Sequence, residues 1–293
     1  LAGVELNKVE RIQTQLREMG HEVPDAAALL AKSRQFLATA KAEWEAKDYH
    51  AAYKDSQRAV RPLRLLMRAE WEAAAKSLGP DAPSTASPFA VSYFTLPKHW
   101  KFRSLLEQCS PGGNKLADGD FEQADGLPTG WRIQQATPDE VEGVARVTGN
   151  KPHDGRRCLM IEVRQRSQTV ANATPTANSK TAPAPPPPIS VLEPTYLAVS
   201  SPPVALAPGS LVRVSGWYNV PKPIEASADG ALIFDTAGGE PLGVRLIEGT
   251  KGWKRFTLFR RVPASGVMQL TTALTGIGTV YFDDLTIEPL NSR

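Results

Sequence analysis

The stretch GGNKLADGDFEQADGLPTGW, residues 112–131, decides how the rest of the sequence is read. It contains a short apolar strand, a Gly-Asp turn, Phe-Glu and then Gly-Trp, which is not typical of a helix, a phosphate-binding loop or a linker. Phe121 is a large apolar side chain that can anchor a first strand, and Gly119 before it can adopt the backbone geometry of a turn. The stretch therefore indicates the start of a β-rich domain about a third of the way along the chain.

Downstream of this stretch, apolar residues alternate with polar ones at the period of a half-buried strand. The alternating positions are Leu159, Ile161 and Val163, then Val212, Val214 and Tyr218, and later Leu270, Thr272 and Leu274. Further strand-like runs are ALIFDT (231–236), WKRFTLFRRV (253–262) and TVYFDDLTI (279–287). No helical pattern lies between them, so the sequence predicts seven or eight short antiparallel strands in a β-sandwich rather than a βαβ fold.

The first 78 residues have the apolar spacing of three helices. The first follows Val9, Ile12, Leu16 and Met19 and ends at Gly20, the second opens at Pro24-Asp25, and Asp48 can cap the third. Pro62 should kink the third helix, because proline lacks an N–H. The apolar faces expected to be buried are Leu29, Leu30, Phe36, Leu37, Ala40 and Trp44 in the second helix and Tyr53, Val60, Leu63, Met67, Trp71 and Leu78 in the third.

The sequence thus predicts an α+β chain with separate domains, an antiparallel helical hairpin or bundle at residues 1–78 followed by an antiparallel β-sandwich at residues 111–293. Residues 28–60 resemble a tetratricopeptide hairpin, but they cover barely one repeat where a solenoid needs about three. A helical spacer or packing bundle is therefore favoured over a peptide-binding repeat.

Two segments do not fit either domain pattern. Residues 79–110 are predicted to be a connector whose aromatic residues dock on a flanking domain, namely Tyr93, Phe94, Trp100 and Phe102. Residues 168–204 are rich in Ala, Thr, Asn and Pro, with PAPPPP at 183–188. Such a composition favours extended polyproline II, so this segment is predicted to be a long surface loop inserted into the sandwich.

Composition excludes several classes of function. The 293-residue chain has a net charge of +3 and contains no run of five basic residues, which argues against nucleic-acid binding. No apolar run approaches the roughly 20 residues of a membrane span. The first residues, LAGVELNKVE, contain no initiator Met or signal sequence and look like an interior segment of a longer protein. Cys109 and Cys158 could pair in an exported protein or lie free in a core.

The order of three motifs resembles the family 4/9/22-type carbohydrate-binding modules, which are galactose-binding-like jelly rolls. The opening GGNKLADGDFE with GW at 130–131, the middle segment HDGRRCLMIEV at 153–163 and the closing YFDDLTIEPL at 281–290 match that family's pattern. The segments SPFAVSYFTLPKHW and VSGWYNVPKPI, together with the helices, also resemble the C-terminal part of large, uncharacterised exported proteins of planctomycete bacteria. These resemblances imply a jelly roll that spans about residues 112–290, binds polysaccharide without catalysis and belongs to an exported protein.

The resemblance also implies a structural calcium ion where the first and last strands meet. The matching positions are Glu122, Asp283 and Asp284. Carboxylates suit Ca²⁺, and carboxylates placed close together repel one another unless a cation neutralises them. In a regular strand, Asp283 would point to the same face as the apolar Leu285 and Ile287. This favours Asp283 over Asp284 as the buried ligand. The alternative is that these acids only form hydrogen bonds at a strand edge.

Sugar binding requires exposed aromatic rings with hydrogen-bonding neighbours. In LVRVSGWYNV, Val212, Val214 and Tyr218 share one face, which leaves Arg213, Trp217 and Asn219 on the other. With Trp253, these residues form the predicted glycan site. Either tryptophan could instead pack in the core or against a loop.

Catalysis finds little support in the sequence. The four histidines, His21, His50, His99 and His153, have no nearby Ser or Cys in a nucleophile motif, and HExxH, CxxC and Walker patterns are missing. The sequence therefore predicts a non-enzymatic chain, either a carbohydrate-binding module on a helical spacer or a structural domain of an exported or envelope protein.

Overall fold

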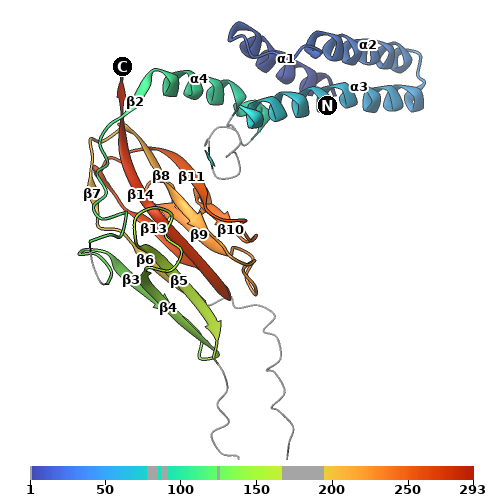
Figure 1. The fold of residues 1–293 in the computed structure, drawn as a ribbon. Helices are drawn as coiled ribbons and strands as arrows, with labels where there is room; N and C mark the ends of the chain where they lie inside the picture. Colours follow the sequence, from blue (N-terminus) through green and yellow to red (C-terminus); the bar gives the residue numbers. More distant parts are fainter. Residues whose placement is uncertain (1, 78–84, 87–91, 124–125, 167–194) are drawn as a thin grey trace, which may run out of the picture. The chain divides into compact units, whose positions relative to one another are not determined.

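The structure, a computed structural model, describes residues 2–77, 85–86, 92–123, 126–166 and 195–293, with only the backbone at 85–86. It divides into a helical unit, residues 1–110 with 292–293, and a β-sandwich unit, residues 111–291 (Figure 1). The predicted helical region followed by an antiparallel β-sandwich is confirmed. Among the described residues, no helix has both the length and the apolar composition needed to span a bilayer.

The elements before residue 111 are mostly helical. In chain order they are α1 (Ala2–Glu18), α2 (Ala26–Glu45), α3 (Tyr49–Lys76), the two-residue β1 (Thr85–Ala86), the 3₁₀ helix η2 (Tyr93–Thr95), α4 (Leu96–Glu107) and β2 (Cys109–Pro111). The first helix stops as predicted, because Gly20 takes a φ of +75° directly after it. Asp48 caps α3 by accepting a 3.0 Å hydrogen bond from the Ala51 N–H, and α3 continues through Pro62.

The core of the helical unit lies between α1 and one side of the α2–α3 hairpin. Val9 and Leu16 of α1 are fully buried in one cluster with Leu30, Leu63 and Leu66 of the hairpin. The predicted connector extends this unit, with Leu96 in the same cluster and Trp100 packed against it. Tyr93 joins the same cluster and donates hydrogen bonds to the Val9 carbonyl and Gln13 Oε1, and Phe102 is also buried, whereas Phe94 is 46% exposed.

Three aromatic residues expected to be buried in the helices are exposed. Trp44, Tyr53 and Trp71 have 63%, 66% and 44% of their surface accessible. Apolar residues occur around much of α2 and α3, but α1 covers only one side of the hairpin. Helical periodicity alone therefore could not tell which apolar side would be covered. Leu78 lies outside the described residues.

The sandwich consists of two antiparallel sheets. The β14 sheet has the order β11-β8-β14-β5-β4, with β11 (Lys254–Arg261), β8 (Leu211–Asn219), β14 (Gly278–Ser292), β5 (Cys158–Gln165) and β4 (Val141–Thr148). The β13 sheet has the order β10-β9-β13-β6-β3, with β10 (Val244–Leu246), β9 (Ala231–Asp235), β13 (Leu270–Leu274), β6 (Tyr196–Ser200) and β3 (Arg132–Ala136). The 3₁₀ helix η3 (Glu240–Leu242) precedes β10, and β7 (Val204–Ala205) pairs with β12 (Val267–Met268).

Strand alternation places the predicted apolar residues inside the sandwich. Leu159, Ile161, Val214, Phe282 and Ile287 of the β14 sheet are each at most 1% exposed, as are Leu197, Val199, Ile233, Leu270 and Leu274 of the β13 sheet. Burial of each large side chain contributes about 1.5–3 kcal/mol, which makes this interior the main stabilising part of the unit.

The stretch that opened the sequence analysis lies along the last strand, as the resemblance implied. The Gly112 and Lys115 N–H groups donate to the carbonyls of Pro289 and Ile287, and the Leu285 N–H donates to the Gly119 carbonyl over 2.9 Å. Gly119 is needed for close approach rather than for a turn, since an added Cβ would lie 2.0 Å from the Leu285 carbonyl oxygen. Phe121, fully buried, itself takes a φ of +57°.

Two further expectations can be compared with the structure. The composition of residues 168–204 predicts a loop throughout, but Tyr196–Ser200 and Val204–Ala205 are strands. Residues 168–194 lie outside the described part of the chain. Cys109 and Cys158 are buried free thiols. Of the two alternatives, a disulfide or free thiols in a core, the structure shows the free thiols.

Candidate functional site

The four residues predicted to bind a glycan meet on the outer face of the β14 sheet. Arg213, Trp217 and Asn219 share one side of β8, opposite the buried Val212 and Val214. Trp253 precedes β11 and packs against the cluster of Cys158, Met160 and Tyr281, which lies on the same side of β5 and β14.

Contacts within the protein already use much of this face. The ring of His153 stacks on Trp217 with centroids 4.0 Å apart and planes 17° apart, and it meets Trp253 edge-on at 5.7 Å. Asn219 is 7% exposed and accepts a hydrogen bond from Thr250 Oγ1. Arg213 forms an ion pair with Glu288. The sequence grouped the four residues on one surface but gave no sign that His153, from the loop before β5, would cover Trp217.

The predicted calcium ligands form a hydrogen-bonded group around the same loop. Glu122 Oε1 accepts from the backbone N–H groups of Arg156 and Arg157 at 2.7 and 2.8 Å. Asp283 accepts from the N–H groups of His153 and Asp284 at 2.8 and 2.9 Å. Asp284 Oδ2 lies 2.7 Å from His153 Nδ1.

Asp283 is buried, but not for the reason that its parity suggested. A bulge between Asp283 and Thr286 shifts the register, with Asp284 at a φ of +49°. Asp283 therefore shares the outer face with Tyr281, while Leu285 and Ile287 point into the core. It is only 1% exposed. Burial, assisted by the charge of Asp284, raises the pKa of Asp283 to about 7.

These residues do not present an obvious cation site. Within the described residues, no three His, Cys, Asp or Glu side chains are grouped so that they could hold a metal ion. Glu122 Oε1 and both Asp283 oxygens already accept backbone hydrogen bonds. These carboxylates form hydrogen bonds within the protein, and calcium stays a prediction.

The outer face of the β13 sheet carries a second aromatic group, which the sequence analysis missed. Tyr196 of β6 and Phe234 of β9 are half-buried and pack on a small apolar floor formed by Ala198, Leu232 and Ala273. The register places the three floor residues side by side, with Ala198 opposite Ala273 and Ala273 opposite Leu232. Tyr196 was missed because it directly follows the Pro-rich segment and was included in the predicted loop.

The floor shows how the two rings are held. Ala198 and Ala273 are 0% exposed although each side chain is a single methyl group, so larger side chains cover them. Burial, and secondarily the negative charge of Glu240, raises the pKa of Tyr196, which agrees with a ring that is partly covered on this face. Small floor residues thus let aromatic rings rest on the sheet with one side toward it.

Hydrogen-bonding groups surround this aromatic floor. Strand β3 is exposed along its length, with Gln134 opposite Ala198 and Arg132 opposite Ser200. Ser200 and Thr271 share a hydroxyl hydrogen bond of 2.9 Å beside Phe234. The face therefore combines half-exposed rings with amide, guanidinium and hydroxyl groups.

No protein-family model and no curated protein sequence matches the chain. Among solved structures, it is similar to the enzymatically active domain of bacteriophage CBA120 tailspike protein 4, with 11% identity and a TM-score of 0.40 over 60% of this chain and 21% of that one. It is also similar to TmCBM61 in complex with β-1,4-galactotriose, with 16% identity and a TM-score of 0.39 over 62% of this chain and all of that one. A third is the CBM22-1 xylan-binding domain from Paenibacillus barcinonensis Xyn10C, with 11% identity and a TM-score of 0.32 over 63% of this chain and 97% of that one.

Proposed function

We propose that the β-sandwich binds a polysaccharide without catalysis, on the outer face of the β13 sheet. The observation that carries this proposal is the pair Tyr196 and Phe234, half-exposed on the floor of Ala198, Leu232 and Ala273. The apolar C–H face of a pyranose stacks on an aromatic ring while polar neighbours bind its hydroxyl groups. Gln134 and Arg132 on the exposed strand β3 supply such neighbours.

The sequence favoured the opposite face, around Trp217 and Trp253, and that face remains the alternative location. It is the weaker of the two because His153 stacks on Trp217 and because Arg213 and Asn219 have partners in the protein. We further propose that the helical unit acts as a spacer and that the protein is exported, as the sequence resemblance implies.

Affinity electrophoresis of the intact chain in gels containing soluble xylan, galactan or mixed-linkage glucan tests the proposal. Retardation by at least one polysaccharide is expected. Tyr196→Ala should weaken it about tenfold, since loss of one ring contact is worth about 1.5 kcal/mol. Tyr196→Phe, which keeps the ring, should bind like the unaltered chain.

Trp253→Ala and Trp217→Ala are the matched variants on the other face. Each should bind the polysaccharide with an affinity within about twofold of that of the unaltered chain. If they abolish retention while Tyr196→Ala does not, the ligand lies on the β14 sheet. If no polysaccharide retards the chain, glycan binding is rejected and the structural or assembly role becomes the better interpretation.

A further inference from the structure

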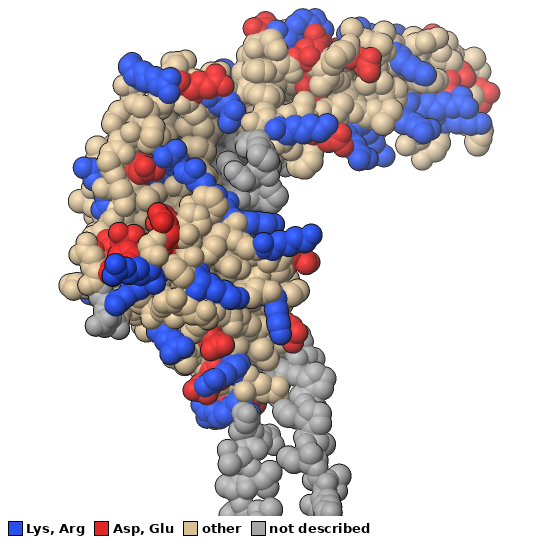
Figure 2. Space-filling view, viewed as in Figure 1, with Lys and Arg blue, Asp and Glu red and all other residues tan. Residues whose placement is uncertain are grey.

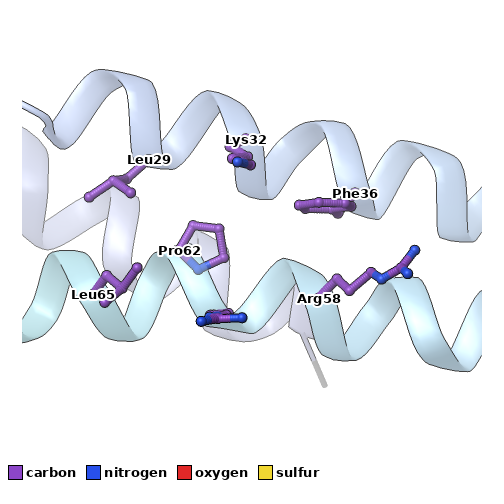
Figure 3. A pocket seen from close by; sticks show the side chains of 7 residues that line it. Leu29, Lys32, Phe36, Arg58, Pro62 and Leu65 are labelled. Atoms are coloured by element: carbon purple, nitrogen blue, oxygen red, sulfur yellow. The ribbon is translucent and has the colours of Figure 1, made fainter.

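The α2–α3 hairpin has an apolar groove on the side not occupied by α1. A cavity of about 430 Å³ lies between the two helices, within the size range of ligand pockets. Figure 3 shows Leu29 and Phe36 of α2 across from Pro62 and Leu65 of α3. Pro62 is buried, Leu29 and Phe36 are half-buried, and Leu65 is 53% exposed. We call these four residues, with Lys32, Arg58 and Arg61, the α2–α3 groove.

The groove continues in both directions along α3. A cavity of about 670 Å³ shares Leu29 and Leu65 with it and reaches Lys76, and a cavity of about 530 Å³ shares Arg58 and Arg61 and reaches His50. From His50 to Lys76, α3 rises by about 39 Å at about 1.5 Å per residue. This length accommodates several turns of another helix.

The contrast between neighbouring leucines shows that the hairpin has two apolar sides. Leu30 and Leu66 face α1 and are at most 4% exposed. Leu65, one position before Leu66, lines the groove, as does Leu29, which also packs against the cluster on the α1 side. On the first side, α1 fills the space between α2 and α3. The second side presents apolar residues flanked by basic ones, and an amphipathic helix packs on such a surface with its apolar stripe inward.

The charged residues of the groove indicate which side chains a bound helix would have beside its apolar stripe. The lining of the central cavity and of the one toward His50 includes Lys32, Lys54, Arg58 and Arg61 and no carboxylate, whereas Asp25 and Glu72 lie only at the cavity toward Lys76. Arg58 pairs with Asp55, but within the part of the chain that the structure describes, Lys32 and Arg61 have no carboxylate in ion-pair range. Acidic side chains beside the apolar stripe would complement this rim.

A second copy of this chain docked through the same groove would place basic rims against each other, which costs free energy.

We propose that the α2–α3 groove binds an acidic amphipathic helix of a partner protein. Its apolar stripe contacts Leu29, Phe36, Pro62 and Leu65, and its Asp or Glu side chains pair with Lys32 and Arg61. This interaction lies in the helical unit and is independent of the proposed glycan site.

The test uses two synthetic helical peptides of about 20 residues with the same leucine stripe, one flanked by glutamates and one by lysines. Fluorescence anisotropy with the intact chain should show that the glutamate peptide binds at least about tenfold more tightly than the lysine peptide. Raising NaCl from about 50 to 500 mM should narrow that difference, because salt screens surface charges.

The chain itself supplies matched controls. Lys32→Glu with Arg61→Glu should weaken the glutamate peptide at least tenfold and strengthen the lysine peptide. Arg64→Glu, an exposed change on α3 outside the three cavities, should alter either affinity less than twofold. Leu65→Gln should weaken both peptides about fivefold. Circular dichroism confirms that each variant keeps its helices.

Three outcomes overturn the proposal. The first is equal affinity for the two peptides, or binding of neither at about 1 mM. The second is an Arg64→Glu effect as large as that of the double variant. The third is a concentration-dependent dimer that Leu65→Gln dissociates, which would identify a second copy as the occupant.

Discussion

On the outer face of the β14 sheet, the Trp217 ring stacks on His153, whereas on the outer face of the β13 sheet Tyr196 and Phe234 pack on Ala198 and Ala273. Tryptophan, the larger ring, thus lies where a loop has folded over it. On the β13 sheet, no other aromatic ring of the described chain stacks on Tyr196 or Phe234. Strand parity identifies which residues point outward, but the neighbouring loops decide which of them can meet a ligand.

The small net charge of the chain does not favour one face over the other. Figure 2 shows Lys and Arg interspersed with Asp and Glu over the visible side of the sandwich. With a net charge of only +3, long-range attraction of an anionic polymer is weak. Local packing, rather than charge, therefore determines which face is open to a ligand.

The largest effect is expected from the ion pair that ties the two sheets together. Arg260 of β11 and Asp235 of β9 are 5% and 0% exposed with Nε and Oδ2 2.7 Å apart, and Arg260 also donates to the Leu242 carbonyl beside β10. Arg260→Ala leaves a buried carboxylate without its partner and should lower the free energy of unfolding by about 3–5 kcal/mol. Urea denaturation measures this change.

The adjacent Arg261 is exposed and supplies the control. Arg261→Ala should cost less than about 1 kcal/mol. A loss below about 1 kcal/mol for Arg260→Ala would show that the two sheets do not depend on this pair.

Gly119→Ala tests the packing of the opening stretch against β14. The added methyl group would meet the Leu285 carbonyl oxygen at 2.0 Å, so the backbone must move, at a cost of about 2–3 kcal/mol. Gly113→Ala is the matched control, because a Cβ added at Gly113 would point into open space, with nothing within 4 Å. Similar unfolding midpoints for the two variants would contradict the close approach of these segments.

Asp283 should make the loop over the β14 face sensitive to pH. Its pKa is raised to about 7 by burial, so protonation is favoured in the folded state. The resulting stability is fully present below about pH 4 and is lost as pH rises through about 7. Denaturation at several pH values, in buffer that contains a chelator, measures how the free energy of unfolding depends on pH. Asp283→Asn should remove this dependence. Asp154→Asn, a change at an exposed carboxylate of the same loop, should not.

The same titration tests the calcium prediction. A bound cation would stabilise ionised Asp283, so adding Ca²⁺ at pH 8 would raise the melting temperature and suppress the pH slope. If neither Ca²⁺ nor a chelator shifts the melting temperature, the hydrogen bonds from His153 and Asp284 account for the site without a metal.

Much of the fold could be predicted because strand periodicity is a local property. Val212, Val214 and Tyr218 had to share one face whatever β8 paired with. The bulge after Asp283 and the exposure of Trp71 could not be predicted in this way. The bulge depends on the opening stretch at residues 112–131, and the exposure of Trp71 depends on which side of the hairpin α1 covers. Both neighbours are far away in the sequence.

The candidate sites were predictable to different degrees for the same reason. Trp217 and Asn219 were placed together correctly, since they are two residues apart on one strand. Tyr196 was missed because it was included in the loop predicted from the Pro-rich segment before it. Its neighbours in space, Ala198 and Ala273, come from the strand it starts and from a strand much later in the chain. A ring on a floor of alanines leaves no local pattern in the sequence.

The smallest effect expected is the coupling between His153 and Trp217, and it tests the comparison most directly. A stacked ring pair is worth about 1 kcal/mol beyond its buried area. A double-mutant cycle with His153→Ala, Trp217→Ala and the double variant should therefore give a coupling energy of about 1 kcal/mol by urea denaturation. His153→Ala should also increase acrylamide quenching of tryptophan fluorescence, because it uncovers one face of the indole. A coupling energy near zero with unchanged quenching would mean that Trp217 is as open as the rings of the β13 sheet, and the β14 face would become an equal candidate for the glycan.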